Sequence, residues 1–128
     1  MAHAHKHAQS SAKFFGGKLE DYLKIHDWID CTKAHMPDVR HRALRHHSLG
    51  IFECEKVFGS VLVNSDSKSV PVRVIAERHI LEDLGFIPTP QDWLKEMKKV
   101  PWMANSKALS GSIEIDKPQD VRTISNAR

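Results

Sequence analysis

The sequence predicts a mainly α-helical protein, a compact bundle of four to five helices with at most one short β-hairpin near residues 61–74 and an extended C-terminal tail. Two observations lead to this prediction. Apolar residues recur at helical spacing in several segments, and glycine, proline or a capping residue stands at the ends of those segments. The length of 128 residues and the hydrophobic content of 41% suit one domain with a modest core.

The first two helices are predicted from about His5 to Phe15 and from about Lys18 to Met36. Gly16-Gly17 ends the first helix and Pro37 ends the second, because glycine terminates helices and the residue before a proline is disfavoured in helical conformation. The apolar face of the second helix carries Tyr22, Ile25, Trp28, Ile29, Thr32 and Met36. This is the pattern of an amphipathic helix.

A third helix is predicted from Asp38, its N-cap, to about Phe58, with Gly59 after its end. Its inward positions are Leu44, His47, Ile51, Cys54 and Phe58. Gly50 lies in its middle, at a cost of roughly 1 kcal/mol relative to alanine. A glycine in this position marks either a close approach or a bend.

The segment from Ser60 to Val74 has a different pattern. Two valine-rich runs, Val61–Val63 and Val70–Val74, flank a polar stretch. They indicate a short β-hairpin or an irregular loop that leads into a helix, and we favour a loop with at most a short hairpin.

Two further helices are predicted after this segment. One runs from about Pro71 to Leu84 and ends at Gly85. The other runs from Gln91 to about Lys99, with Thr89-Pro90 as its cap and first turn.

The helical domain is predicted over residues 7–100. Residues 1–6 are expected to form a flexible N-terminus, in which His3 and His5 are more typical of an adventitious metal binder than of a site. Residues 101–128 are polar and lack periodicity, so we expect an extended or disordered tail. This tail could dock on a protein partner or on another copy of the chain in a homo-oligomer.

Composition excludes several classes of protein. No apolar run approaches the roughly 18 to 20 residues of a membrane span, so no membrane partner is expected. Two cysteines, Cys31 and Cys54, form no C-x-x-C motif, which argues against a cysteine-rich zinc finger and favours the reducing cytoplasm. No Walker loop, G-x-G-x-x-G or G-x-S-x-G motif is present, which sets aside nucleotide hydrolysis by those routes.

The nine histidines are the chemical signal of the chain. Imidazole is the commonest metal ligand and titrates near neutral pH. Two histidines stand four residues before an aspartate, His26 before Asp30 and His79 before Asp83, so each pair shares one helix face. Each pair is either a metal ligand with its carboxylate neighbour or a structural pair that satisfies buried polarity.

The third predicted helix holds the densest group of histidines and arginines. His41, His46 and His47 lie among Arg40, Arg42 and Arg45. Neutral imidazoles among arginines suit a metal site with an anionic ligand or a phosphate pocket. The alternatives are a solvated basic face or one that binds a nucleic acid backbone, which the charge of +3 permits but does not favour.

Three blocks of the sequence share one further feature: His7–Lys13 with Gly16-Gly17, the stretch from His26 to Phe52, and the stretch from Val70 to Trp93. Together they resemble a family of small uncharacterised proteins found in prokaryotes and their viruses. The resemblance covers roughly residues 7 to 94. It implies a compact helical domain and no established activity.

The doublet His26-Asp27 is similar to the His-Asp pair of HD-type metal phosphohydrolases. On a helix, however, Asp27 lies about 100° from His26, and the surrounding spacing is not that of the family. Metal-dependent phosphate hydrolysis is therefore a runner-up interpretation.

The preferred prediction is a small helical metal-binding protein that holds a divalent ion, zinc above others. The predicted ligands are His26, His41, His47, His79, Asp30 and Asp83, with His7 and His35 in reserve. An open coordination position would allow hydrolysis, and a closed one would be structural. The alternative is a non-enzymatic interaction module in which Arg40, Arg42, Arg45 and His46 bind nucleic acid or an acidic protein.

Overall fold

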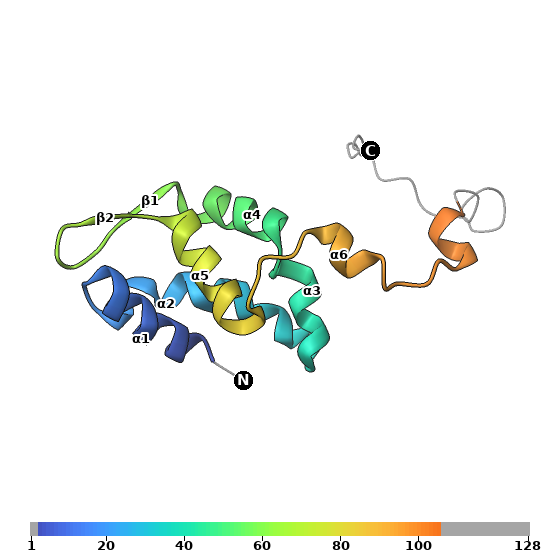
Figure 1. Cartoon of the computed structure of the whole chain (residues 1–128), viewed down its shortest axis with the longest axis horizontal. Helices are drawn as coiled ribbons and strands as arrows, with labels where there is room; N and C mark the ends of the chain where they lie inside the picture. The colour runs from blue at the N-terminus through green and yellow to red at the C-terminus, as the bar shows by residue number, and fades with distance from the viewer. Residues whose placement is uncertain (1–2, 106–128) are drawn as a thin grey trace, which may run out of the picture. The chain divides into compact units, whose positions relative to one another are not determined.

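The computed structural model describes residues 3–105, and these are mainly α-helical, as predicted (Figure 1). The helices are α1 (Ala4–Phe15), α2 (Leu19–Asp30), α3 (Arg42–Arg45), α4 (Ser48–Phe58), α5 (Val72–Leu84) and α6 (Pro90–Leu94). Three short 3-10 segments are η1 (Cys31–Ala34), η2 (Val39–His41) and η3 (Pro101–Ala104), and two strands are β1 (Val61–Val63) and β2 (Ser69–Pro71). The chain divides after Met97 into two units, of which the second includes η3.

Helix α5 is central to the first unit. It contacts α1, α2, α4 and β2, while α1 and α2 lie side by side (Figure 1). Helices α2 and α5 each bury one face with the spacing i, i+3, i+4, i+7, i+8. The buried residues are Tyr22, Ile25, His26, Ile29 and Asp30 on α2, and Val72, Ile75, Ala76, His79 and Ile80 on α5. Two histidines and an aspartate thus occupy core positions that are normally apolar.

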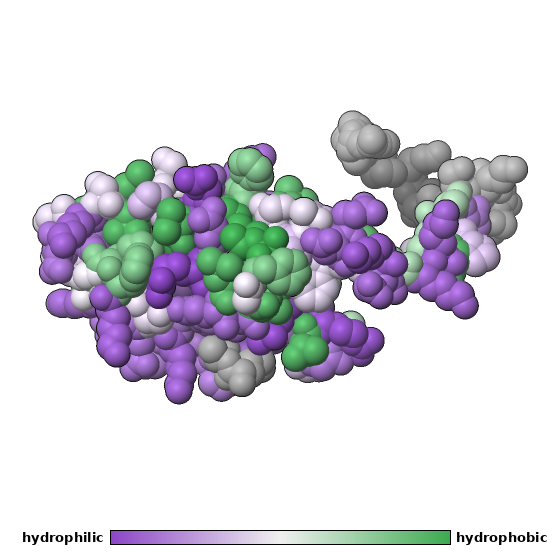
Figure 2. Space-filling model, viewed as in Figure 1, coloured by the Kyte–Doolittle hydropathy of each residue, from purple (hydrophilic) through white to green (hydrophobic). Residues whose placement is uncertain are grey.

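The surface departs from the usual pattern in the opposite sense, because several large hydrophobic side chains are exposed. Hydrophobic side chains lie among hydrophilic ones on the face drawn in Figure 2. On α4, Leu49, Phe52 and Val57 are all about half exposed or more. The core therefore derives part of its cohesion from polar contacts, and these must be satisfied in pairs because an unpaired buried polar group is costly.

The second predicted helix is shorter than expected. Helix α2 ends at Asp30 rather than at Met36, and η1 continues the chain as a tighter turn in which the amide of His35 donates to the carbonyl of Thr32. Helix ends commonly tighten in this way. The prediction of a helix to Met36 is wrong for that reason.

The prediction of a single third helix is also wrong. Residues 38–58 form η2, α3 and α4, with a break at His46 and His47. His46 leaves helical geometry at φ −87°, ψ 69°, and His47 is extended. A Cβ on Gly50 would lie 1.9 Å from the carbonyl oxygen of Arg45, so the glycine permits this close approach.

The short hairpin is confirmed. Strands β1 and β2 are antiparallel, with Val61 opposite Pro71 and Leu62 opposite Val70. In the turn, the buried Asn64 donates from Nδ2 to the hydroxyl of Tyr22 at 3.1 Å, which ties the hairpin to α2. Helix α5 then begins at Val72, close to the predicted start.

The last predicted helix is shorter than residues 91–99. Helix α6 covers Pro90–Leu94, and a capping box between Thr89 and Asp92 defines its start as predicted. Residues 106–128, most of the predicted tail, lie outside the described residues. Among the described helices, none has the length and hydropathy needed to cross a membrane.

Candidate metal centre

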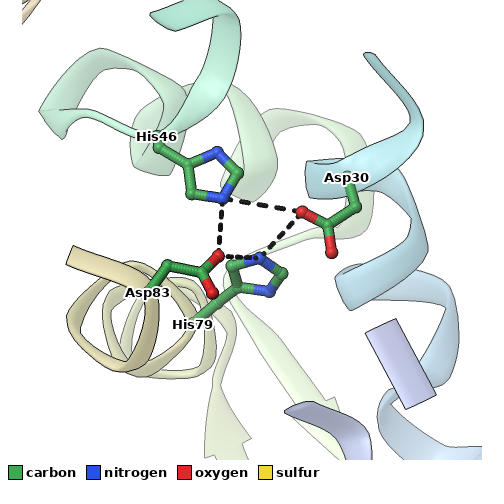
Figure 3. A group of neighbouring side chains, drawn as sticks. All are labelled: Asp30, His46, His79 and Asp83. Carbon is green, nitrogen blue, oxygen red and sulfur yellow. Dashed lines mark hydrogen bonds and ion pairs between the residues drawn. The ribbon is translucent and has the colours of Figure 1, made fainter. Parts of the chain in front are cut away.

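Four buried side chains from three parts of the chain converge on one point (Figure 3). Asp30 comes from the end of α2, His46 from the break before α4, and His79 and Asp83 from successive turns of α5. One ligand atom from each lies within 4.8 Å of the others. We call these four residues the Asp/His cluster.

The distances within the Asp/His cluster are short and similar. Asp83 Oδ2 lies 3.0 Å from His46 Nε2 and 3.3 Å from His79 Nε2. Asp30 Oδ1 lies 3.1 Å from His79 Nε2 and 3.5 Å from His46 Nε2. One carboxylate oxygen of each aspartate therefore lies close to the Nε2 atoms of both His46 and His79, as the dashed lines of Figure 3 show.

The cluster is almost sealed from solvent. The side chains of His46 and His79 have no exposed surface, and those of Asp83 and Asp30 are 3% and 9% exposed. Burial of this kind penalises every charge that lacks a counter-charge. A pair of carboxylates in such a place requires cations or strong donors around it.

Both carboxylates and His46 favour the charge states in which they can bind a metal ion. Burial alone would raise the pKa of Asp83, but hydrogen bonds from His46, His7 and His79 outweigh it and hold that pKa well below its usual range. Burial likewise opposes ionisation of Asp30, whose pKa is nonetheless lowered by its hydrogen bond with His79. Burial lowers the pKa of His46. Ionised carboxylates and a neutral imidazole are ligand forms.

A second layer of side chains supports His79. Its Nδ1 lies 2.8 Å from Nδ1 of His26, and Nε2 of His26 lies 2.8 Å from the hydroxyl of Ser11 on α1. All three residues are buried. Burial lowers the pKa of His26 to about 2, so His26 is neutral.

His7 supports Asp83 from α1. Its Nε2 lies 3.2 Å from Asp83 Oδ1 and its Nδ1 lies 2.7 Å from Glu82 Oε1. Its ring stacks on His79 with centroids 3.8 Å apart. Burial would lower the pKa of His7, but its hydrogen bonds with Asp83 and Glu82 outweigh that effect and raise it. The sequence alone indicates His7 only as a reserve metal ligand.

The structure brings together three of the six ligands predicted from sequence, namely Asp30, His79 and Asp83, and adds His46. The predicted neighbourhood of His79 and Asp83 is confirmed by their 3.3 Å contact. His26 is not part of the cluster but contacts Nδ1 of His79, the ring nitrogen that points away from the cluster. Asp27, its partner in the doublet, is exposed and outside the cluster.

His41 and His47, the other predicted ligands, lie outside the Asp/His cluster. His47 is the N-cap of α4, where its Nδ1 accepts from the amide of Gly50 at 3.0 Å. His41 pairs through Nδ1 with the hydroxyl of Thr32 at 2.9 Å, and its ring meets that of His46 edge to face. The His47 contact lies within the 38–58 segment, and the His41 contact joins this segment to η1.

The three predicted anion-binding arginines contact different partners. Arg40 pairs with Asp38 at 2.8 Å on the surface. Arg42 lies 3.6 Å from Asp83 Oδ1. Arg45 stacks over the ring of Trp28 at 3.9 Å and donates to its carbonyl. Each guanidinium already has a partner within the protein.

One local signal could have indicated the role of His46. Ser48 and Gly50 stand within one turn after it, and serine is a preferred N-cap. A break in the helix at this point would have separated the directions of His46 and His47. Periodicity places His47 inward, and His47 is buried, but it is His46 that the structure places in the Asp/His cluster.

The fold and the site together define a small helical protein with a buried group of histidines and aspartates that could hold a metal ion. The chain belongs to the family described as a domain of unknown function (DUF6915), which matches residues 2–103. No curated protein and no solved structure matches the chain.

Proposed function

We propose that this protein binds one divalent metal ion, with zinc as the best-fitting ion, and that Asp30, His46, His79 and Asp83 are its ligands. The observation that carries the proposal is the set of four distances between the carboxylate oxygens and the ring nitrogens, from 3.0 to 3.5 Å. In a tetrahedral zinc site with bonds of about 2.0 to 2.1 Å, neighbouring ligand atoms are about 3.3 Å apart.

Hydrogen bonding alone accounts for the cluster less well. A neutral imidazole has one N–H to donate, so His46 and His79 can serve at most two of the four close pairs through their Nε2 atoms. One cation between the four atoms serves all of them. It also adds positive charge beside the two buried carboxylates, of which, among the described residues, Asp83 alone has an arginine, Arg42, at 3.6 Å.

The donor set favours zinc over harder ions. Two imidazole nitrogens and two carboxylate oxygens suit zinc, whereas magnesium and calcium prefer six or more oxygens. Four protein ligands in a sealed position are typical of a structural centre. Such an ion would join α2, the break before α4, and α5.

Metal analysis tests this proposal. Protein purified without a histidine tag and reconstituted with zinc is expected to retain one ion per chain after desalting. His79→Gln and Asp83→Asn are expected to lose it. The matched control is the double variant His3→Gln, His5→Gln, which removes two exposed histidines and should retain the ion. Substoichiometric zinc in the reconstituted, folded wild type would refute the proposal.

Hydrolysis is the second candidate function, because Asp30 also lines a surface pocket. That pocket includes Asp27, Cys31 and Lys33. If Asp30 released the ion, water could enter from this side and be activated. Zinc-dependent cleavage of a phosphoester or peptide substrate, absent from His79→Gln, would support hydrolysis. Stoichiometric zinc binding without any turnover would support only the structural role.

A further inference from the structure

A buried chain of hydrogen bonds runs from α1 to the Asp/His cluster. It passes from the hydroxyl of Ser11 to Nε2 of His26, from Nδ1 of His26 to Nδ1 of His79, and from Nε2 of His79 to Asp30 Oδ1. The three distances are 2.8, 2.8 and 3.1 Å. Ser11, His26 and His79 are each at most 1% exposed, so no bulk water competes for these contacts.

Such a chain has two internally consistent proton orders. In the first, Ser11 donates to Nε2 of His26, Nδ1–H of His26 donates to His79, and Nε2–H of His79 donates to Asp30. In the second, His79 carries its proton on Nδ1 and donates to His26, and Nε2–H of His26 donates to Ser11. Each imidazole holds one proton in both orders. In the change from the first order to the second, the Nε2 proton of His79 leaves to solvent on the Asp30 side, the Nδ1 proton of His26 passes to Nδ1 of His79, and Nε2 of His26 takes up the hydroxyl proton of Ser11, which solvent replaces. The histidine pair therefore neither gains nor loses a proton overall.

Metal binding distinguishes the two orders. A metal ion needs the lone pair of His79 Nε2, which the first order occupies with a proton. Only the second order leaves that lone pair free, and it then requires an acceptor for Nδ1–H of His79. His26 Nδ1 is the atom in that position, at 2.8 Å. Hydrogen bonds of this kind fix the tautomer and orientation of metal-binding histidines.

We infer that the hydrogen-bond direction along Ser11, His26 and His79 reverses when a metal ion occupies the Asp/His cluster, and that His26 is a positioning residue of the centre. This inference rests on the proposed metal binding. The reversal needs no movement of heavy atoms, because the same distances serve both orders. Metal binding at the cluster thereby changes the direction of the hydrogen bond between His26 and Ser11 on α1, a helix that supplies no ligand itself.

The contrast with His46 supports the assignment. Nδ1 of His46 is buried and has no hydrogen-bond partner among the described residues. His79 is therefore the imidazole of the cluster whose tautomer the protein controls. His26 would act through His79 alone, since it lies outside the four ligands.

Two-bond proton–nitrogen correlation spectra of ¹⁵N-histidine protein test the inference directly. Spectra are taken with EDTA and with one equivalent of zinc, at pH 8, above the ordinary imidazole pKa of about 6.5. We expect His26 to change from the Nδ1–H to the Nε2–H tautomer, and His79 to change from Nε2–H to Nδ1–H. Zinc binding at His46 and His79 with an unchanged His26 tautomer would overturn this inference alone. Absence of zinc binding would overturn the proposed function as well.

Variants separate positioning from packing. His26→Gln is expected to weaken zinc affinity by about 10- to 100-fold, as loss of a hydrogen-bond partner to a ligand does. The matched control is His41→Gln, which alters another buried histidine paired with a hydroxyl group. Equal losses in the two variants would overturn the inference. If His26→Gln fails to fold, Ser11→Ala replaces it, with a smaller loss expected and an unchanged zinc affinity as the contrary result.

Discussion

Individual residues in this protein have roles that their position in the sequence does not reveal. Gly50 lies inside α4, where alanine would ordinarily be preferred by about 1 kcal/mol. The nearest atom to a Cβ at this position would be the Arg45 carbonyl oxygen, at 1.9 Å. A backbone atom cannot move aside as a flexible side chain can, so the glycine is a requirement of the break between α3 and α4.

Gly50→Ala is therefore expected to destabilise the protein, by about 1 to 3 kcal/mol as overpacking does. The sign is opposite to helix propensity, which makes the prediction specific. Urea unfolding followed by circular dichroism measures it, with Glu53→Ala on the exposed face of α4 as the control. A Gly50→Ala protein as stable as the wild type would contradict the close approach.

At the scale of elements, the break at His46 and His47 brings His46 into the candidate metal centre. Nδ1 of His47 accepts from the amide of Gly50, and Trp93 of α6 donates from Nε1 to the carbonyl of His46 at 2.9 Å. These contacts hold the two halves of the segment at an angle. The His46 ring then faces α5, while the His47 ring is used as a cap.

Substitutions of His47 test this division of roles. His47→Ala should lower the free energy of unfolding by about 1 kcal/mol through loss of the cap, and His47→Ser should preserve stability because serine caps helices well. Both variants should retain zinc when reconstituted. Loss of zinc from a folded His47→Ser protein would instead identify His47 as a ligand.

At the scale of the whole molecule, stability depends on keeping several buried histidines neutral. Burial lowers the pKa of His26, His41 and His46 in the folded state, from about 6.5 in the unfolded chain. Below that value the unfolded chain binds protons that the folded chain does not. Acid must therefore favour unfolding. His7 acts oppositely, since its raised pKa contributes stability that is lost as the pH rises through its folded value.

The metal-free protein is expected to lose stability as the pH falls from about 6.5 to 5, by up to about 1.4 kcal/mol per pH unit for each of these histidines. Urea unfolding in EDTA over this range measures the slope. In His26→Gln the free energy of unfolding should fall less steeply with pH, because one of the titrating histidines is absent. A slope of zero in the wild type would mean that these histidines keep their ordinary pKa when folded.

Zinc should stabilise the whole domain because its ligands come from three separate segments. A ligand at 100 times its dissociation constant adds about 2.7 kcal/mol to the free energy of unfolding. Urea unfolding of the wild type with zinc and with EDTA measures this gain, which His46→Gln should abolish. An equal gain in that variant would place the ion elsewhere.

The sequence by itself determined the helical class, the segment in which a short hairpin could form and the shared helix face of His79 and Asp83. These follow from local rules, since glycine, proline and capping residues set helix ends and an i, i+4 pair shares one face whatever the fold. Only the tertiary structure decided the rest of the site. Asp30 and His46 reach His79 from segments 49 and 33 positions earlier in the chain, and His46 does so because packing breaks a helix that periodicity had predicted as continuous. No spacing rule encodes a contact that depends on how distant segments pack.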